Sequence, residues 1–175
     1  SKDGMTYTYK IREGVKWYTN EGEEYGEVKA KDFVAGLKHA ADKKSQALYL
    51  VQDSIKGLDD YVNGKTTDFS TVGIKATDDH TVVYTLNHPE SFWNSKTTMG
   101  VLAPISEDFL ASKGDDFGKA TDVTSILYNG GYILKGLTSK SSIEMTKNKN
   151  YWDKENVFID DIKLSFFDGQ DADSL

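Results

Sequence analysis

The feature that most constrains the fold is the stretch from Tyr128 to Asp153, which carries two runs of alternating apolar and polar residues. The runs centre on Tyr132–Leu134 and Ser142–Met145, and the segment Gly136–Ser141 between them is polar. Two such runs with a short polar gap predict an antiparallel hairpin. Asn129-Gly130-Gly131 comes just before it, and these residues take positive φ at low cost. We therefore predict that a tight turn leads into the first strand.

The same stretch and three others carry sequence motifs that occur in a fixed order along the chain. The aromatic pair Tyr151-Trp152 stands in a polar setting, which is unusual for large rings. Together the motifs resemble the signatures of the family 5 solute-binding proteins of ABC importers, which bind oligopeptides and dipeptides, and in detail those of the streptococcal Ami/Ali type. The residues that carry the resemblance are Asn129-Gly130-x-Tyr132, Lys135 and Lys147–Asp153, together with Tyr7–Trp17, Val28–Val34 and Val72–Val82.

Most of the chain is covered by this resemblance, which implies both a fold and a function. It implies a two-lobed protein of the periplasmic-binding-protein type II kind that captures peptides in an interlobe cleft and delivers them to an ABC permease. Residues 1–175 are then a single domain, a fragment of a larger protein and a portion of lobe I. The resemblance also implies an extracytoplasmic location at the cell surface, with a lipoprotein anchor outside this segment. Gly131 and Lys149 stand where many members have proline, which affects turn rigidity rather than chemistry.

Position along the family motifs also suggests which residues form a wall of the peptide cleft. Gln46 follows the first predicted helix, Met99 lies in the apolar stretch after Phe92-Trp93, and Tyr128-Asn129-Gly130 leads toward the interlobe region. Packing is the alternative role for each of them. For the protein as a whole, the alternatives are a receptor of the same fold for a nickel complex, a heme or a sugar, or a surface protein-interaction module.

The rest of the chain predicts an α+β fold with a mostly antiparallel sheet and several helices, because most strand links are short enough for hairpins. Strands are expected over residues 5–11, 15–17, 72–76, 82–86 and, as the last strand, 157–159 with 162–166. Helices are expected over 31–44, over 46–63 in two pieces, over 90–97 and from 106. We expect Asn20–Gly26, which holds three glutamates, to be a solvated loop, and we assign His39 to packing or the surface. The inward positions of the elements predict core rings at Tyr7, Tyr9, Trp17, Phe33, Tyr84, Phe109 and Phe166.

Composition and motifs argue against several other classes of protein. A net charge of −7 does not suit a nucleic-acid partner, which needs a clustered positive field. There is no cysteine, no G-x-S-x-G elbow and no phosphate loop, and His39, His80 and His88 stand apart rather than at metal-ligand spacing. Asp168, Asp171 and Asp173 lack the spacing of a calcium loop. We therefore expect a binding protein, not an enzyme, with no cofactor and no metal site.

Overall fold

Residues 1–166 are described by the structure, a computed structural model, and they divide into two compact units. Unit 1 is Ser1–Glu13 with Val28–Glu107, and unit 2 is Gly14–Glu27 with the chain from Asp108 onward. The chain therefore passes from one unit to the other three times. The acidic stretch at 168–173 lies outside the described residues.

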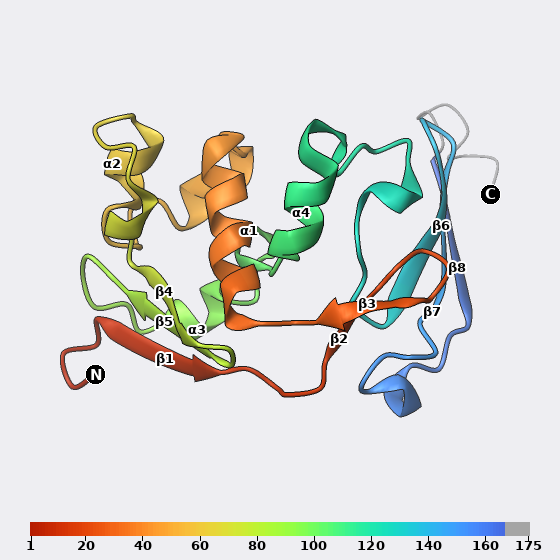
Figure 1. Cartoon of the computed structure of the whole chain (residues 1–175), viewed down its shortest axis with the longest axis horizontal. Coiled ribbons are helices and arrows are strands. Elements are labelled where there is room, and N and C mark those ends of the chain that lie inside the picture. Colours follow the sequence, from red (N-terminus) through yellow and green to blue (C-terminus); the bar gives the residue numbers. More distant parts are fainter. Residues whose placement is uncertain (167–175) are drawn as a thin grey trace, which may run out of the picture. The chain divides into compact units, whose positions relative to one another are not determined.

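Unit 1 is built on a three-stranded antiparallel sheet in the order β1-β5-β4 (Figure 1). The central strand is rich in β-branched residues, which favour a pleated surface, and its Tyr84 lies opposite both Tyr7 and Ile74. Helices α1 and α2 rise on the same side of this sheet in Figure 1. The elements of the unit are β1 (Thr6–Lys10), α1 (Ala30–Asp42), η1 (Gln46–Leu50), α2 (Leu58–Val62), η2 (Phe69–Thr71), β4 (Ile74–Asp78), β5 (Thr81–Thr85), α3 (Trp93–Lys96) and η3 (Gly100–Leu102).

The core of unit 1 lies between the sheet and these helices. Leu37 and Ala41 of helix α1 are buried, as their spacing predicts, while Phe33, Val34 and Ala40 are partly buried and pack against the core. Trp93 at the start of α3 is also fully buried and lies 5.3 Å from the ring of Tyr84, centroid to centroid. The core thus joins the first helix, the central strand and the short helix that follows it.

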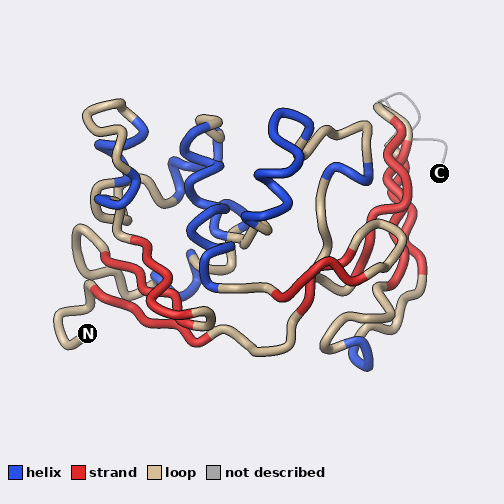
Figure 2. Tube along the Cα trace, in the orientation of Figure 1, coloured by secondary structure: helices blue, strands red, loops and turns tan. Residues whose placement is uncertain are grey.

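Unit 2 consists mainly of strands and loops (Figure 2). The predicted hairpin is confirmed as β6 and β7, and β8 pairs with β7 to complete an antiparallel sheet in the order β6-β7-β8. Strand β6 is longer than predicted, because a register shift after Leu134 lets it continue to Thr138. The elements of the unit are β2 (Lys16–Tyr18), β3 (Glu24–Glu27), α4 (Glu107–Lys113, whose first residue belongs to unit 1), η4 (Gly114–Asp116), η5 (Val123–Ser125), β6 (Tyr132–Thr138), β7 (Ser142–Lys147), η6 (Lys154–Asn156) and β8 (Asp161–Ser165).

Three local expectations were wrong. The acidic stretch is not wholly a loop, because Glu24–Glu27 forms β3, where Glu24 pairs with Lys16 of β2 at 3.5 Å. Gln46–Leu50 is a 3₁₀ turn rather than an α-helix. Phe166 is 53% exposed and does not belong to the core, whereas Trp17, Tyr84 and Phe109 are buried as predicted.

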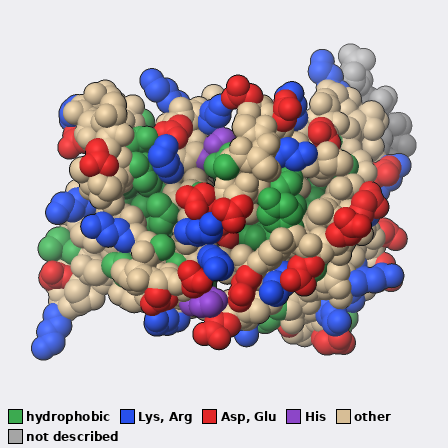
Figure 3. All heavy atoms as spheres, in the orientation of Figure 1, with side chains coloured by type: hydrophobic (Ala, Val, Ile, Leu, Met, Phe, Trp, Pro, Cys, Tyr) green, Lys and Arg blue, Asp and Glu red, His purple; other side chains and the backbone are tan. Residues whose placement is uncertain are grey.

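The α+β class with antiparallel sheets is confirmed. Charged side chains of both signs are interspersed on the face shown in Figure 3. Within residues 1–166, no helix combines the length and apolar composition needed to cross a bilayer.

Candidate functional site

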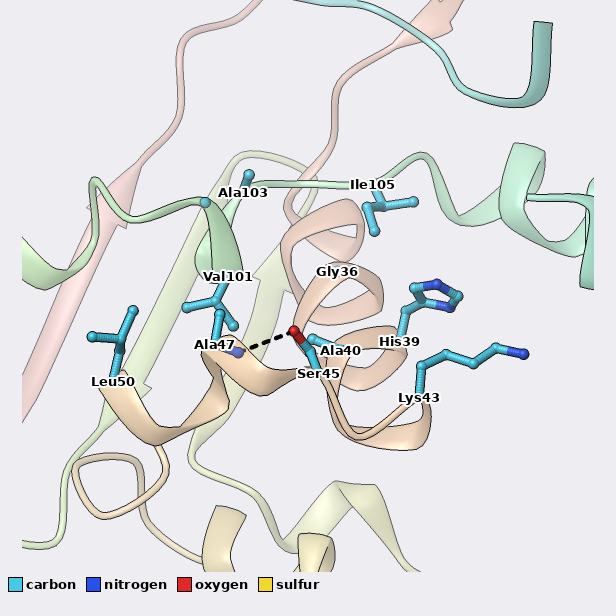
Figure 4. Close-up of a pocket in the computed structure, with 11 residues that line it drawn as sticks. Gly36, His39, Ala40, Lys43, Ser45, Ala47, Leu50, Val101, Ala103 and Ile105 are labelled. Carbon is cyan, nitrogen blue, oxygen red and sulfur yellow. Dashed lines mark hydrogen bonds between the residues drawn. The ribbon is translucent and has the colours of Figure 1, made fainter. Parts of the chain in front are cut away.

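A cavity of about 520 Å³ opens in unit 1 beside the C-terminal half of α1 (Figure 4). This volume lies in the range of small-ligand sites. Its walls come from α1, from the turn that begins η1 and from the segment after Met99. The lining residues are Gly36, His39, Ala40, Lys43, Ser45, Ala47, Leu50, Gly100, Val101, Ala103 and Ile105.

The cavity has an apolar end and a basic end. Ala47, Leu50 and Val101 point toward one another at the first, while His39 and Lys43 extend together from one side of α1 at the second (Figure 4). Partial burial and the neighbouring charge of Lys43 lower the pKa of His39 below its ordinary value of 6.5. The ring is therefore neutral at pH 7 and can both donate and accept a hydrogen bond, while Lys43 supplies a cation.

One glycine and one carboxylate bring the walls of this cavity together. A Cβ on Gly36 would lie 2.4 Å from the carbonyl oxygen of Ala103, so only glycine lets the chain pass so close to α1. The buried Asp32 accepts from the backbone amides of Lys29 and Glu107, at 2.9 and 3.1 Å. Its own carbonyl accepts from the amide of Ile105 at 3.0 Å. Asp32 thus caps the helix and fixes the opposite wall.

Replacing Gly36 with alanine is expected to lower the free energy of unfolding by about 1–3 kcal/mol, because the new methyl group must displace a backbone carbonyl. Urea denaturation measures this loss. Gly100→Ala is the matched control on the same cavity, since no atom of residues 1–166 lies within 4 Å of its Cβ position. Equal losses in the two variants would contradict the role given to Gly36.

Gln46 and Met99, both predicted at the cleft wall, lie beside this cavity. Gln46 is exposed and stands between Ser45 and Ala47, which line the cavity. Met99 is 37% exposed and directly precedes Gly100 and Val101. The fold therefore brings two segments far apart in sequence to one opening, with these two side chains next to it.

Tyr128, Asn129 and Gly130 belong to unit 2, where they precede β6. Tyr128 is buried, exchanges two backbone hydrogen bonds with Tyr18 and donates its hydroxyl to the carbonyl of Val123 at 2.9 Å. Burial raises the pKa of Tyr128 to about 12, so the phenol stays protonated. Asn129 is half-buried and Gly130 is exposed.

Asn148 explains why the sequence signature joins residues so far apart. It is fully buried, its side-chain amide donates to the carbonyl of Gly130 at 3.0 Å, and its backbone amide donates to the carbonyl of Gly131 at 2.8 Å. Its side-chain oxygen accepts from the amide of Asn150, whose side chain in turn reaches the carbonyl of Gly22. These hydrogen bonds of Asn148 hold the chain at Gly130 and Gly131 and so set its path into β6. We call this arrangement the clamp.

Replacing Asn148 with alanine is expected to lower the free energy of unfolding by about 1–3 kcal/mol, because it removes a fully buried side chain that donates to the carbonyl of Gly130 and accepts from the amide of Asn150. Chemical denaturation of the variant checks this. Asn156→Ala serves as the control, because it removes an exposed side chain that donates to the carboxylate of Asp153, with an expected change within about 0.5 kcal/mol. A similar small change for Asn148→Ala would rule out the clamp.

The glycines of this turn are not there for positive φ, which corrects the prediction. Neither Gly130 nor Gly131 takes positive φ. At Gly131 a Cβ would meet a Val157 methyl group at 3.1 Å, so close packing explains that residue. At Gly130 nothing lies within 4 Å of the Cβ position. Contacts within the described residues therefore do not require glycine at position 130.

The sequence did not place His39 and Lys43 at this cavity. They lie four apart, His39 in the last turn of α1 and Lys43 directly after the helix, a spacing that places them on one face. Their role at a cavity depends on the chain at 100–105 crossing that face, which no local pattern indicates. In residues 1–166, no group of three or more histidine, aspartate and glutamate side chains is placed to hold a metal ion.

The chain thus holds a ligand-sized cavity in unit 1 and a fixed turn in unit 2, and comparison with known families gives the class of protein to which it belongs. The chain belongs to the bacterial extracellular solute-binding proteins, family 5 Middle, whose model matches residues 1–174. This confirms the resemblance found in the motifs and agrees with an extracytoplasmic location for the family.

Known relatives place the chain within this family more closely. It is 72% identical to the oligopeptide-binding protein AliA of Streptococcus pneumoniae and 71% identical to SarA of Streptococcus gordonii. Each match covers 98% of this chain and 26% of the relative, so the chain spans about a quarter of the length of these proteins. Among solved structures, peptide-bound OppA of Listeria monocytogenes matches with a TM-score of 0.82 and 33% identity, over 95% of this chain and 32% of that one.

Proposed function

We propose that this chain is part of an extracytoplasmic oligopeptide-binding protein that captures peptides in a cleft between two lobes and delivers them to an ABC permease. The observation that carries the proposal is the identity of 71–72% to proteins named as oligopeptide-binding, over nearly the whole chain. The peptide-bound relative of the same fold adds support. Residues 1–175 are proposed as a single domain and a portion of lobe I, and a lipid anchor is proposed outside them.

The proposed binding mode relies on peptide backbone rather than on side-chain identity. Hydrogen bonds along an extended peptide provide affinity, and hydrated pockets accept varied side chains. The cavity beside Gln46 and Met99 suits one such side chain, with apolar contacts at one end and a cation at the other. Closure is then a hinge motion that peptide favours by binding the closed state more tightly.

The proposed cleft wall consists of Gln46, Met99, Tyr128, Asn129 and Gly130. Gln46 and Met99 contribute exposed side chains. Tyr128 holds its segment in place, and Asn129 and Gly130 offer backbone to a peptide. Contacts within residues 1–166 do not require glycine at position 130, which supports this role, since glycine permits close approach of a ligand.

Mass spectrometry of small molecules that co-purify with the full-length parent and with the 175-residue chain tests the proposed function. We expect peptides from the parent and few or none from the isolated chain, because one lobe supplies only one wall. Metal complexes or sugars in place of peptides, or no ligand from the parent at all, would overturn the peptide assignment.

Replacing Gly130 with alanine in the full-length parent is expected to weaken peptide binding about tenfold, equivalent to about 1.4 kcal/mol. Stability should change by no more than about 0.5 kcal/mol, because the added methyl group meets no atom of residues 1–166 within 4 Å and φ is not positive. Isothermal titration calorimetry with a peptide recovered from the parent measures the affinity, and chemical denaturation measures the free energy of unfolding. Unchanged affinity would remove Gly130 from the cleft wall.

A further inference from the structure

The chain contains two Asn-Gly pairs, Asn63-Gly64 and Asn129-Gly130. The two pairs differ in their hydrogen bonding in the folded chain. Glycine after asparagine leaves the following amide nitrogen unhindered, so it can attack the asparagine side chain. We propose that Asn129 is a site of spontaneous deamidation in the folded chain, whereas Asn63 is protected. This inference does not depend on the proposed function.

The reaction needs only water. The backbone nitrogen of Gly130 forms a bond to Cγ of Asn129 and loses its proton, while the Cγ–Nδ2 bond breaks and ammonia leaves with that proton. The product is a five-membered succinimide. Water then adds to one of its two carbonyls and breaks one carbon–nitrogen bond, which yields either aspartate or isoaspartate at position 129.

The surroundings of Asn129 leave both reacting groups available. Gly130 is exposed, belongs to no strand or helix and has open space around its Cβ position. Within the described part of the chain, no hydrogen bond engages the amide nitrogen of Gly130 or the side-chain amide of Asn129. The backbone of Tyr128 and the carbonyl of Gly130 are held by other contacts, so the reactive pair lies between two fixed points.

Asn63 offers a contrast within the same molecule. It directly follows α2, and its side-chain amide donates to a carboxylate oxygen of Asp59 at 2.8 Å. The amide of Gly64 donates to the carbonyl of Tyr61 at 3.1 Å. Ring closure at this pair therefore requires two hydrogen bonds to break first, one at each reacting group.

Deamidation at Asn129 would alter the turn that leads into β6. Either product adds one negative charge, and isoaspartate also inserts a methylene group into the main chain between Tyr128 and Gly130. The hydrogen bond from Asn148 to the carbonyl of Gly130 would then be displaced. Only the effect on peptide binding rests on the proposed function.

Incubation of the folded chain in mildly alkaline buffer, followed by peptide mapping with mass spectrometry, tests the inference. We expect conversion at Asn129 to be several-fold faster than at Asn63 in the folded chain, and the two rates to converge in urea. Equal rates in the folded chain, or faster conversion at Asn63, would overturn the proposal.

Two variants separate the chemistry from the fold. Gly130→Ala should slow conversion at Asn129 several-fold and leave Asn63 unchanged, because the methyl group hinders attack by the nitrogen. Asp59→Ala should raise conversion at Asn63 by freeing its amide. An unchanged rate at Asn129 in Gly130→Ala would rule out attack by that nitrogen, and an unchanged rate at Asn63 in Asp59→Ala would rule out the protection assigned to Asp59.

Discussion

Replacing Trp93 with alanine is expected to lower the free energy of unfolding by about 3–5 kcal/mol, the range for removing a fully buried aromatic side chain. The indole packs against Tyr84 of the central strand, with 5.3 Å between ring centroids, and against Tyr7 of β1 at 6.2 Å. Its loss leaves a cavity at the centre of unit 1 that rigid strands cannot fill. Urea denaturation followed by circular dichroism measures the change.

Two control variants test whether the loss of stability in Trp93→Ala comes from removing a buried aromatic ring. Trp93→Phe keeps an aromatic ring in the same place and should cost clearly less than alanine. Phe92→Ala removes the neighbouring ring, which is 56% exposed, and should cost about 1 kcal/mol or less. If Phe92→Ala proved as costly as Trp93→Ala, the assignment of Trp93 to the core of unit 1 would be wrong.

Replacing Lys96 with methionine is expected to cost about 3 kcal/mol at pH 7, because it leaves the buried carboxylate of Glu90 without its cation. The ammonium lies 2.9 Å from that carboxylate, whose side chain is 3% exposed, while the side chain of Lys96 is 19% exposed. This partial exposure places the expected loss at the low end of the range for buried ion pairs. Thermal or urea unfolding of the variant checks the value.

The pH dependence of this loss follows from the titration of Glu90. Burial alone would raise the pKa of Glu90, but hydrogen bonding from Ser54 and the ion pair with Lys96 outweigh it and hold the pKa below its ordinary value. In the wild-type chain the resulting stability is present above the unfolded pKa of about 4.3 and is lost as pH falls through the lower, folded pKa. In Lys96→Met the buried carboxylate instead becomes easier to protonate, so the difference between the two chains should shrink as pH falls.

A double variant separates the ion pair from simple packing. Glu90→Gln combined with Lys96→Met removes both charges and should recover much of the stability that the single change loses. If the loss of stability in the double variant equalled the sum of the losses in Glu90→Gln and Lys96→Met, Glu90 and Lys96 would not be coupled.

Features set by local periodicity could be predicted from the sequence. The β6–β7 hairpin follows from its alternating runs, and α1 from apolar residues at three- and four-residue spacing. Trp17, Tyr84 and Phe109 were predicted in the core for the same reason, because inward positions repeat with the period of their element. The family was predicted from motifs spread along the whole chain, which the family model confirms.

Features set by contacts between distant segments could not be predicted. Strand β3 forms in an acidic stretch because it pairs with β2, and the cavity exists because the chain at Ala103 crosses α1 at Gly36. Phe166 follows the alternation of β8, but alternation identifies a face without saying whether anything covers it. Gln46 and Met99 lie next to the cavity, yet their contact with peptide stays a prediction.

The three passages of the chain between the units have a consequence for synthesis on the ribosome. All of unit 1 has been made once residue 107 emerges, whereas β2 and β3 of unit 2 emerge early, and Tyr18 of β2 cannot pair with Tyr128 until much later. We therefore expect unit 1 to fold before residues 14–27 can make their contacts with the later part of unit 2. Cleavage between residues 107 and 108 would separate β2 and β3 from the rest of their unit. A protein divided at this boundary would therefore hold unit 2 in two incomplete pieces.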